Sequence, residues 1–277
     1  MTETAIAAIV VTYQSAETVA ACLEALKAAK HVAEIRVVDN GSDDGTMEVV
    51  QFHAARDPRI RFIANPDNPG FATACNQGAA ASTSPWLAFV NPDLMVEVDS
   101  LQRLVEASAS REGALIGAVL FDEQGCEDGA ARRRAPDFAA MLRHASAREL
   151  RIPSNGEAIQ NLEAVSGALM VLPRTVFNGI GGFDNDYRLH AEDLDLCRRV
   201  LAAGHGVAIA NQVRVCHMRG VSSRARPLFV EWHKHRGFWR YYRKFDAAHH
   251  GFATQAAVCA MIWLRFAATA TGKLIRP

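Results

Sequence analysis

Residues 87–95 read Leu87-Ala88-Phe89-Val90-Asn91-Pro92-Asp93-Leu94-Met95, an apolar run that stops abruptly at a polar Asn-Pro-Asp. A short apolar run bounded by a breaker is typical of a strand buried on both faces of a parallel sheet. Pro92 has no N–H to donate, so the chain is expected to leave the sheet there. Asp93 then lies at the carboxyl edge of the sheet, where open α/β folds bind their ligands. A carboxylate there, with a second acceptor at Asn91, suits a divalent cation that carries a phosphate. The motifs on either side decide against the alternative, a turn aspartate that caps a loop.

Outward from this stretch, strand-like and helical segments alternate along the chain. Strands are expected at 5–11, 34–38, 60–63, 87–91 and 115–121, and helices at 15–29 (with Ser15 as N-cap), after 46 to about 56, 71–81 and 101–109. Residues 122–163 show no sustained period and are expected to form a variable region over the sheet edge. Beyond them we expect a strand at 165–172, a helix at 192–203 and short strands at 207–209 and 213–217. The alternation predicts an α/β fold with a mostly parallel central sheet flanked by helices.

The composition narrows the class of protein. With 277 residues, 49% hydrophobic and 22% charged, the chain has the size of one large or two small globular domains. Its 30 basic residues balance 30 acidic ones, so no global charge points to nucleic acid. The six cysteines form no C-x-x-C pair, which argues against a zinc site and against a disulfide framework. The N-terminus lacks the basic region and long apolar core of a signal peptide, so a cytoplasmic protein with reduced thiols is expected.

Three strand ends in the first half carry polar clusters: Thr12-Tyr13, residues 39–46, and Asn91 to Asp93. Because the carboxyl ends of parallel strands meet at one edge, these clusters are expected to form one composite site. The carboxylate of Asp39 suits a nucleoside pocket, where it accepts a hydrogen bond from the base imide or a ribose hydroxyl. A turn that caps the next helix through Ser42 is equally compatible with this cluster.

The second half contributes an acidic cluster, His190-Ala191-Glu192-Asp193-Leu194-Asp195, at the start of a helix. Crowded carboxylates are costly unless a function uses them, although a helix N-terminus offsets part of their repulsion. A carboxylate beside a metal-bound nucleotide can accept a proton from an attacking hydroxyl. His217, at a strand end, is expected to be either a further metal ligand or a structural partner.

Taken together, these motifs resemble a known family. The set consists, in chain order, of Val10-Val11-Thr12-Tyr13, residues 37–46, Asn68-Pro69-Gly70-Phe71, Asn76-Gln77-Gly78, Asn91-Pro92-Asp93, Ser166-Gly167-Ala168, Gly181-Gly182-Phe183-Asp184, residues 192–197 and His217. It is similar to the family 2 inverting glycosyltransferases of the GT-A fold, in their rhamnosyltransferase-like branch. The resemblance spans residues 5–223, and the ordered set is specific although each motif alone is weak.

The resemblance implies a hexosyltransferase of cell-envelope polysaccharide synthesis that uses a nucleotide-diphosphate sugar, with dTDP-rhamnose as the best guess, and Mg²⁺ or Mn²⁺. It implies a catalytic domain over 1–223, with a nucleotide-binding half (1–121) and an acceptor half (122–223), followed by a helical extension (224–277). The metal motif reads Asn91-Pro92-Asp93 here, so Asp93 and His217 are the expected metal ligands. Asp193 is the expected general base with Glu192 beside it, while Gly167 and Asp195 are expected on the acceptor side. The expected donor-binding residues are Thr12, Tyr13, Asp39, Ser42, Asn68, Gly70, Phe71, Asn76 and Asn91. The family's processive Q-x-x-R-W motif is absent, which favours transfer of a single sugar.

The C-terminal part is basic and aromatic over 219–244 and apolar over 252–271, with Arg265 as the one interruption. The basic stretch suits a pyrophosphate lid or contact with anionic lipid better than nucleic acid. The apolar stretch is expected to be a core-packing or interfacial helix, and a homodimer interface is the alternative to peripheral contact with the inner face of the cytoplasmic membrane. The acceptor is expected to be a saccharide or a lipid-linked sugar. A sugar-nucleotide nucleotidyltransferase and a catalytically weak nucleotide-binding homologue are the rival functions.

Overall fold

The structure is a computed structural model that describes residues 4–218 and 227–275. Its strands are β1 (Ile6–Thr12), β2 (Val32–Asp39), β3 (Ile60–Ala64), β4 (Trp86–Val90), β5 (Leu94–Met95), β6 (Leu115–Phe121), β7 (Arg132–Arg133), β8 (Ile159–Asn161), β9 (Ala164–Val165), β10 (Leu169–Pro173) and β11 (Val207–His217). Its helices are α1 (Val19–Ala28), α2 (Thr46–Ala54), α3 (Phe71–Ala80), α4 (Ser100–Ala109), α5 (Phe138–Arg143), α6 (Arg174–Gly179), α7 (Glu192–Ala202), α9 (Pro227–Phe245) and α10 (Phe252–Ile275). Residues 219–226, the start of the expected basic stretch and the expected boundary at residue 223, lie outside the described residues.

One nine-stranded sheet organises the described part of the chain, in the order β3-β2-β1-β4-β10-β6-β11-β5 with β8 beside β11. Strands β1 to β4 are parallel to one another. Strand β10 is antiparallel to both β4 and β6, and β6 is parallel to β11, so β6 and β11 run in the direction of β1 to β4. Only β5, β8 and β10 run the other way. The expected mostly parallel sheet is therefore confirmed, and the carboxyl ends of six strands meet at one edge.

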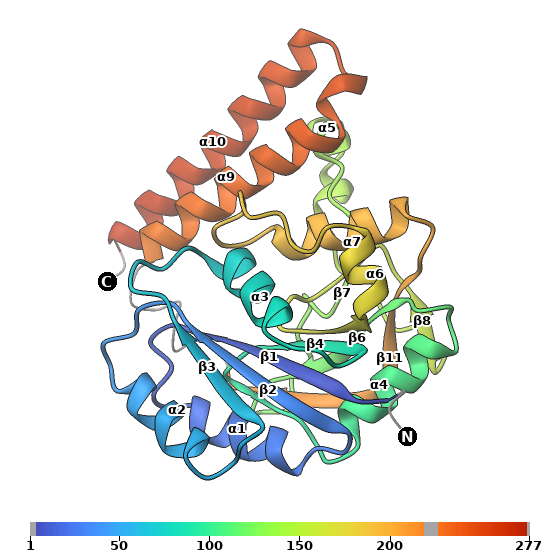
Figure 1. The fold of residues 1–277 in the computed structure, drawn as a ribbon. Coiled ribbons are helices and arrows are strands. Elements are labelled where there is room, and N and C mark those ends of the chain that lie inside the picture. The colour runs from blue at the N-terminus through green and yellow to red at the C-terminus, as the bar shows by residue number, and fades with distance from the viewer. Residues whose placement is uncertain (1–3, 219–226, 276–277) are drawn as a thin grey trace.

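Helices bury both faces of this sheet, which explains why its first strand is apolar along most of its length. Helices α1 and α2 lie against one face and α3 against the other (Figure 1). All seven residues of β1 are buried. Gly78 lets α3 approach β1 closely, since a Cβ there would lie 2.5 Å from Cγ2 of Ile9.

Three element boundaries differ from the sequence-based expectation. Helix α1 begins at Val19 rather than after Ser15, whose hydroxyl donates to the carbonyl of Tyr13 at 3.2 Å instead of capping the helix. The strand expected at 165–172 is interrupted by a turn at 166–168 between β9 and β10. Conversely, the two strands expected at 207–217 are one, β11, whose register shifts between Ala210 and Arg214. A bulge breaks the side-chain alternation without ending the strand, so the sequence pattern divides it.

The region 122–163, expected to be a variable region over the sheet edge, instead forms short strands and a helix that connect the sheet with the C-terminal helices. Strand β8 pairs with β11 and β7 pairs with β9. On α5, the Phe138 ring lies 5.8 Å from Phe238 and 6.2 Å from Tyr242, centroid to centroid. These contacts join residues that are distant in sequence, so the local hydrophobic periodicity does not predict them.

The expected helical C-terminal extension is confirmed as a hairpin of α9 and α10 (Figure 1). The two helices pack through aromatic side chains, with the ring of Trp232 lying 5.0 Å from that of Trp263 and 5.6 Å from that of Phe266. Helix α10 is long and apolar enough to cross a bilayer, and only 11% of its most apolar window is buried against the rest of the protein. Phe252 and Leu264 on this helix are 87% and 70% exposed.

Candidate active site

The carboxyl edge of the sheet gathers the polar strand ends that the sequence singled out. Thr12 and Asp39 are register partners at the ends of β1 and β2. The N–H of Asn65, directly after β3, donates to the carbonyl of Asp39 at 2.8 Å. The N–H of Asn91, directly after β4, donates to the carbonyl of Ala168 at 2.9 Å, just before β10 begins. His217 ends β11 at the same edge because β11 runs in the direction of β4.

Asp39 is buried, and its carboxylate accepts four hydrogen bonds from the chain itself. Oδ1 accepts from the hydroxyls of Thr12 (2.8 Å) and Ser42 (2.6 Å), and Oδ2 accepts from the N–H groups of Gly41 (3.0 Å) and Ser42 (2.9 Å). These bonds use the four lone-pair positions of a carboxylate. Asp39 therefore shapes the loop after β2, and it can contact a nucleotide only by exchanging one of the hydroxyl donors, which rotate freely.

The loop after β1 is held against the same cluster. Tyr13 is half-buried, and the next N–H, of Gln14, donates to the hydroxyl of Ser42 at 2.9 Å. Gln14 has a φ of +53°, a left-handed conformation that non-glycine residues rarely adopt. Strained backbone of this kind is frequent beside ligand sites, because surrounding contacts must hold it in place.

An amide network that the sequence did not indicate lies beside this loop. Nδ2 of Asn65 donates to Oε1 of Gln77 (2.7 Å) and to Oδ1 of Asn40 (3.1 Å), and Nε2 of Gln77 donates to Oδ1 of Asn65 (3.1 Å). The available signal was positional, because Asn65 directly follows a strand just as Asn40 follows Asp39. The network fixes α3 relative to the strand ends.

Four expected donor-binding residues contact the segment that leads into α7. The N–H of Phe71 donates to the carbonyl of Arg188 at 3.0 Å, and Nη2 of Arg188 donates to the carbonyl of Asn68 at 3.0 Å. Gly70 has a φ of +101°, and a Cβ there would lie 2.6 Å from the Arg188 carbonyl oxygen. Asn76 exchanges two hydrogen bonds with the backbone of Phe183, at 2.8 and 2.9 Å. These residues position the segment before the acidic helix, and their contact with a donor stays a prediction.

The two expected metal ligands come together at the edge. Nε2 of His217 lies 3.2 Å from Oδ1 of Asp93, and Nδ1 of His217 lies 3.9 Å from Oδ2 of Asp128. Oδ1 of Asp93 is buried and accepts no hydrogen bond from the described residues. Within those residues no group of three or more His, Cys, Asp and Glu side chains is arranged to hold a metal ion. A buried oxygen without a donor, facing an imidazole nitrogen, nevertheless fits a divalent cation whose other ligands are substrate phosphates and water.

The acidic cluster opens α7 after two residues in the left-handed conformation, His190 and Ala191, with φ values of +67° and +69°. Asp193 forms a buried ion pair with Arg133 of β7, a residue that the sequence did not single out. Oδ2 of Asp193 also accepts the N–H of Gly167 at 3.2 Å, and Oδ1 accepts the N–H of Leu194 at 2.8 Å. Arg133 in turn donates to the carbonyl of Val165 at 2.7 Å.

These surroundings shift the pKa values of the two neighbouring carboxyl groups, those of Asp193 and Glu192, in opposite directions. Burial alone would raise the pKa of Asp193, but the guanidinium of Arg133 and the backbone donors outweigh it and hold that pKa below its ordinary range. Burial, followed by the negative charge of Asp193, raises the pKa of Glu192. Oε2 of Glu192 is buried and has no hydrogen-bond partner among the described residues. Two carboxyl groups with separated pKa values are typical of acid–base sites.

Asp195, expected on the acceptor side, lies two residues after Asp193 on α7 and is fully buried. Its carboxylate accepts hydrogen bonds from Nζ of Lys244 (2.7 and 2.8 Å) and Nε of Arg199 (3.1 Å). Lys244 also donates to Asp184 at 2.7 Å, so these bonds fasten α9 to α7. The contacts give Asp195 a structural role in the joint between α7 and the hairpin.

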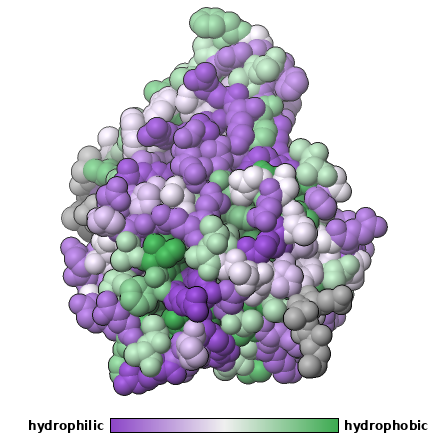
Figure 2. Space-filling model, viewed as in Figure 1, coloured by the Kyte–Doolittle hydropathy of each residue, from purple (hydrophilic) through white to green (hydrophobic). Residues whose placement is uncertain are grey.

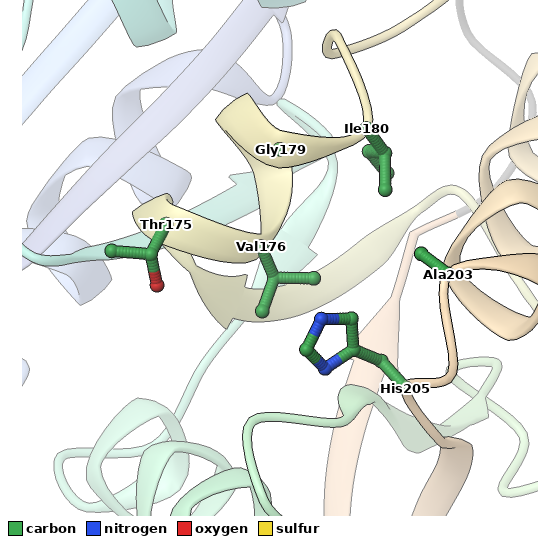
Figure 3. Close-up of a pocket in the computed structure, with 6 residues that line it drawn as sticks. All are labelled: Thr175, Val176, Gly179, Ile180, Ala203 and His205. Carbon is green, nitrogen blue, oxygen red and sulfur yellow. The ribbon is translucent and has the colours of Figure 1, made fainter.

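A hollow of about 300 Å³ lies apart from this site, between α6 and the C-terminal end of α7 (Figure 3). The side chains of Val176, Ile180 and His205 border it, and no carboxylate lines it. Its lining shares no residue with the acidic cluster or with the strand ends. The hollow therefore offers neither the acid–base pair nor the metal ligands.

Comparison with known proteins gives a family match over more than half of the chain. Residues 7–166 match the model of "Glycosyl transferase family 2". The N-acetylglucosaminyl-diphospho-decaprenol L-rhamnosyltransferase of Mycobacterium tuberculosis is 26% identical over 250 residues, covering 77% of this chain and 79% of that protein. Glycosyltransferase AglE of Haloferax volcanii is 27% identical over 217 residues, covering 76% of this chain and 66% of AglE.

Solved structures share the fold at low identity. The mannosyltransferase PcManGT of Pyrobaculum calidifontis, solved with GDP-Man and Mn²⁺, matches with a TM-score of 0.62 at 20% identity, covering 98% of this chain and 79% of that one. GalNAc-T7, solved with UDP, GalNAc and Mn²⁺, matches with a TM-score of 0.62 at 16% identity, covering 78% of this chain and 43% of that one. The expected GT-A fold is thereby confirmed.

Proposed function

The chain belongs to glycosyl transferase family 2 and is a glycosyltransferase, and from this premise we propose that it transfers one sugar, with inversion, from a nucleotide-diphosphate sugar to a lipid-linked or saccharide acceptor of the cell envelope. Rhamnose from dTDP-rhamnose is the proposed donor, supported by the relative from Mycobacterium tuberculosis whose name specifies an L-rhamnosyltransferase. The same name specifies a diphospho-decaprenol acceptor, which supports the lipid-linked alternative for this chain.

One observation carries the proposal: a single turn connects the two halves of the site. The N–H of Gly167 donates to the carboxylate of Asp193 (3.2 Å), and the carbonyl of the next residue, Ala168, accepts the N–H of Asn91 (2.9 Å). Asn91 is two residues from Asp93, which faces His217. The proposed base and the proposed metal ligands thus lie on either side of two linked peptide groups. This short separation suits a reaction in which the sugar donor, held by the metal, must meet the acceptor hydroxyl, held beside the base.

Each residue then has a proposed task. Asp93 and His217 would hold Mg²⁺ or Mn²⁺, which when bound neutralises charge on the departing nucleoside diphosphate. Asp193 is ionised at neutral pH because Arg133 lowers its pKa, so it can accept the proton of the acceptor hydroxyl. The two backbone N–H groups and Arg133 orient that carboxylate, and such positioning contributes several kcal/mol in well-oriented systems. Glu192, with its raised pKa, is proposed to shape the base's surroundings.

Asp193→Asn tests this assignment, because it keeps the size of the side chain and removes its basicity. We expect transfer to fall by roughly two to four orders of magnitude while donor binding survives. Transfer is measured with a panel of dTDP-, UDP- and GDP-sugars, each with and without Mn²⁺, and donor binding by calorimetry. Near-normal turnover in the variant would move the role of the base to Glu192, and absence of turnover in the natural chain with every donor would favour a nucleotide-binding homologue.

We also propose that the α9–α10 hairpin holds the enzyme at the inner face of the cytoplasmic membrane. The observation behind this is the poorly buried apolar face of α10, with Phe252 and Leu264 exposed. Arg265 lies in the middle of this helix, where an interfacial helix can extend it outward and a spanning helix would disfavour it. Flotation with anionic liposomes should carry the protein upward, and binding should fall with salt and with truncation after Lys244. Protein that stays in the soluble fraction at low salt would favour a packing or dimer interface instead.

A further inference from the structure

A narrow crevice lies between α9 and the segment that leads into α7, beside the acidic cluster but distinct from the strand edge. The crevice encloses only about 10 Å³, or about 230 Å³ when the open space at its mouth is counted, and Arg188, His190, His233 and Arg236 line it together with Asp186, Tyr187 and Gly237. A glycine is required at 237, because a Cβ there would lie 2.6 Å from the carbonyl oxygen of His190. None of the lining residues belongs to the Asp93–His217 pair or to the loops after β1 and β2.

The crevice concentrates positive charge that no carboxylate neutralises. The other cations of α9 that face the protein are paired: Lys234 with Glu231, Arg240 with Asp184, and Lys244 with Asp195. Neither Arg188 nor Arg236 forms an ion pair with any residue that the structure describes. Nη2 of Arg188 donates to a backbone carbonyl, that of Asn68, and its remaining donors are available.

The one acidic residue at the crevice does not offset this charge. Asp186 forms an ion pair with Nη2 of Arg240 at 2.6 Å, which engages its carboxylate with a different cation. The guanidinium groups of Arg188 and Arg236 and the imidazoles of His190 and His233 therefore border one small space. Burial lowers the pKa of both imidazoles, so the positive charge comes from the two arginines. Guanidinium forks recognise phosphate oxygens in pairs, and helical spacing places His233 and Arg236 on one face of α9.

The mouth of the crevice is apolar. Phe229 lies one helical turn before His233, and their ring centroids are 4.3 Å apart. The guanidinium of Arg188 lies 5.7 Å from the centroid of the same Phe229 ring. Phe229 is 37% exposed, and its neighbours on α9, Leu228 and Trp232, are 38% and 45% exposed. Figure 2 shows hydrophilic residues over α9, with hydrophobic ones toward the tip of the hairpin. A cationic crevice with an apolar rim suits an amphiphile that carries an anionic head group.

We propose that the arginines of this crevice bind the diphosphate of a prenyl-diphosphate-linked acceptor at its open side, with the first prenyl units against Phe229. The inference rests on the proposed function, which supplies a lipid-linked acceptor. It assigns the acceptor's head group to α9 and leaves the donor diphosphate to the strand edge. His190 precedes Glu192 by two residues along the chain, so the crevice lies next to the acidic cluster that contains Asp193.

Calorimetry with the full chain and farnesyl diphosphate tests the site without any turnover. Arg236→Gln should weaken binding roughly ten- to hundredfold, the effect of losing a charge-assisted bond to phosphate. Arg243→Gln is the matched control, because Arg243 is exposed on the same helix and has no ion pair within the described residues; it should leave the affinity unchanged. Farnesol should bind far more weakly than farnesyl diphosphate, and so should inorganic pyrophosphate.

The contrary outcomes are distinct. Equal loss in both arginine variants would mean nonspecific charge attraction, and equal affinity for pyrophosphate and farnesyl diphosphate would refute the prenyl contact. If Arg236→Gln instead weakens binding of nucleoside diphosphate with Mn²⁺, the crevice serves the donor and the proposal is wrong. Farnesyl diphosphate binding that depends on Arg236 in a chain with no transferase activity would uphold the crevice while refuting the proposed function.

Discussion

Replacing Arg133 by methionine removes the one cation that is bonded to Asp193 among the described residues, and leaves a largely buried carboxylate without its counter-charge. The side chains of Arg133 and Asp193 are 17% and 13% exposed, so the pair is largely shielded from water. Removing one partner of a buried ion pair costs about 3–5 kcal/mol of folding free energy. Since both groups keep some exposure, we expect Arg133→Met to lower the free energy of unfolding by about 3 kcal/mol at pH 7, the lower end of that range.

The double variant Arg133→Met/Asp193→Asn separates charge from packing. The N–H groups of Gly167 and Leu194 donate to different oxygens of Asp193, so a neutral amide can still accept one of them, and the double variant should lose only about 1–2 kcal/mol. A cycle of the four proteins, followed by urea unfolding, should then give a coupling of about 2 kcal/mol or more. Arg134→Met is the control, because Arg134 is exposed next to Arg133 and its side chain has no ion pair within the described residues.

The pH dependence of this variant has a definite sign. In the natural protein the pKa of Asp193 lies below its ordinary range. The Arg133–Asp193 pair therefore contributes fully to stability at pH values above the pKa of Asp in the unfolded chain, about 3.9, and this contribution is lost as the pH falls through the pKa of Asp193 in the folded protein. Without Arg133, burial is opposed only by the backbone donors of Gly167 and Leu194, and we expect it to raise that pKa. The stability gap between variant and natural protein should therefore widen as the pH rises from 5 to 8, and the acidic limb of kcat/KM should move to higher pH. Unchanged urea midpoints together with an unchanged acidic limb would refute the role given to Arg133.

Three further outcomes are expected. Asp39→Ala removes four hydrogen bonds from the loop after β2, so the affinity for nucleoside diphosphate, measured by calorimetry, should fall at least about tenfold. The far-UV circular dichroism spectrum should be retained. An unchanged affinity would mean that Asp39 is not part of the pocket. His217→Ala should abolish the rise in Tm that Mn²⁺ adds to nucleoside diphosphate, and a retained rise would exclude His217 as a ligand. Hydrogen bonds from lysine and arginine outweigh burial and lower the pKa of Asp184 and of Glu231 to about 2, so the bonds that hold the hairpin should weaken as the pH falls from about 4 toward 2. Three of the four tryptophans lie on the hairpin, so their fluorescence should change over that range, and a flat signal would contradict this account.

Local sequence determined the order of strands and helices in the nucleotide-binding half. Each strand there is a short, mostly apolar run, and each ends in a polar residue, such as Asp39, or is followed by one, such as Asn91, because the chain leaves the buried sheet at that point. Parallel strands must end at one edge, so the composite site could be predicted before any coordinates. The pairing of Asp93 with His217 also agrees with this argument, since both follow strands that run in the same direction.

Tertiary structure alone decided how the carboxylates are held. Arg133 lies in a region without hydrophobic period, and it reaches Asp193, 60 residues away, only because β7 pairs with β9. In the same way, Lys244 reaches the buried Asp195 because α9 folds back onto α7. The spacing of residues in the sequence predicts which side chains share a helix face or a strand end. Ion pairs between distant segments depend instead on how whole helices and strands pack together. The sequence therefore determined which edge of the sheet carries the site, and the packing of β7 and α9 determined the charge states of the groups proposed to act there.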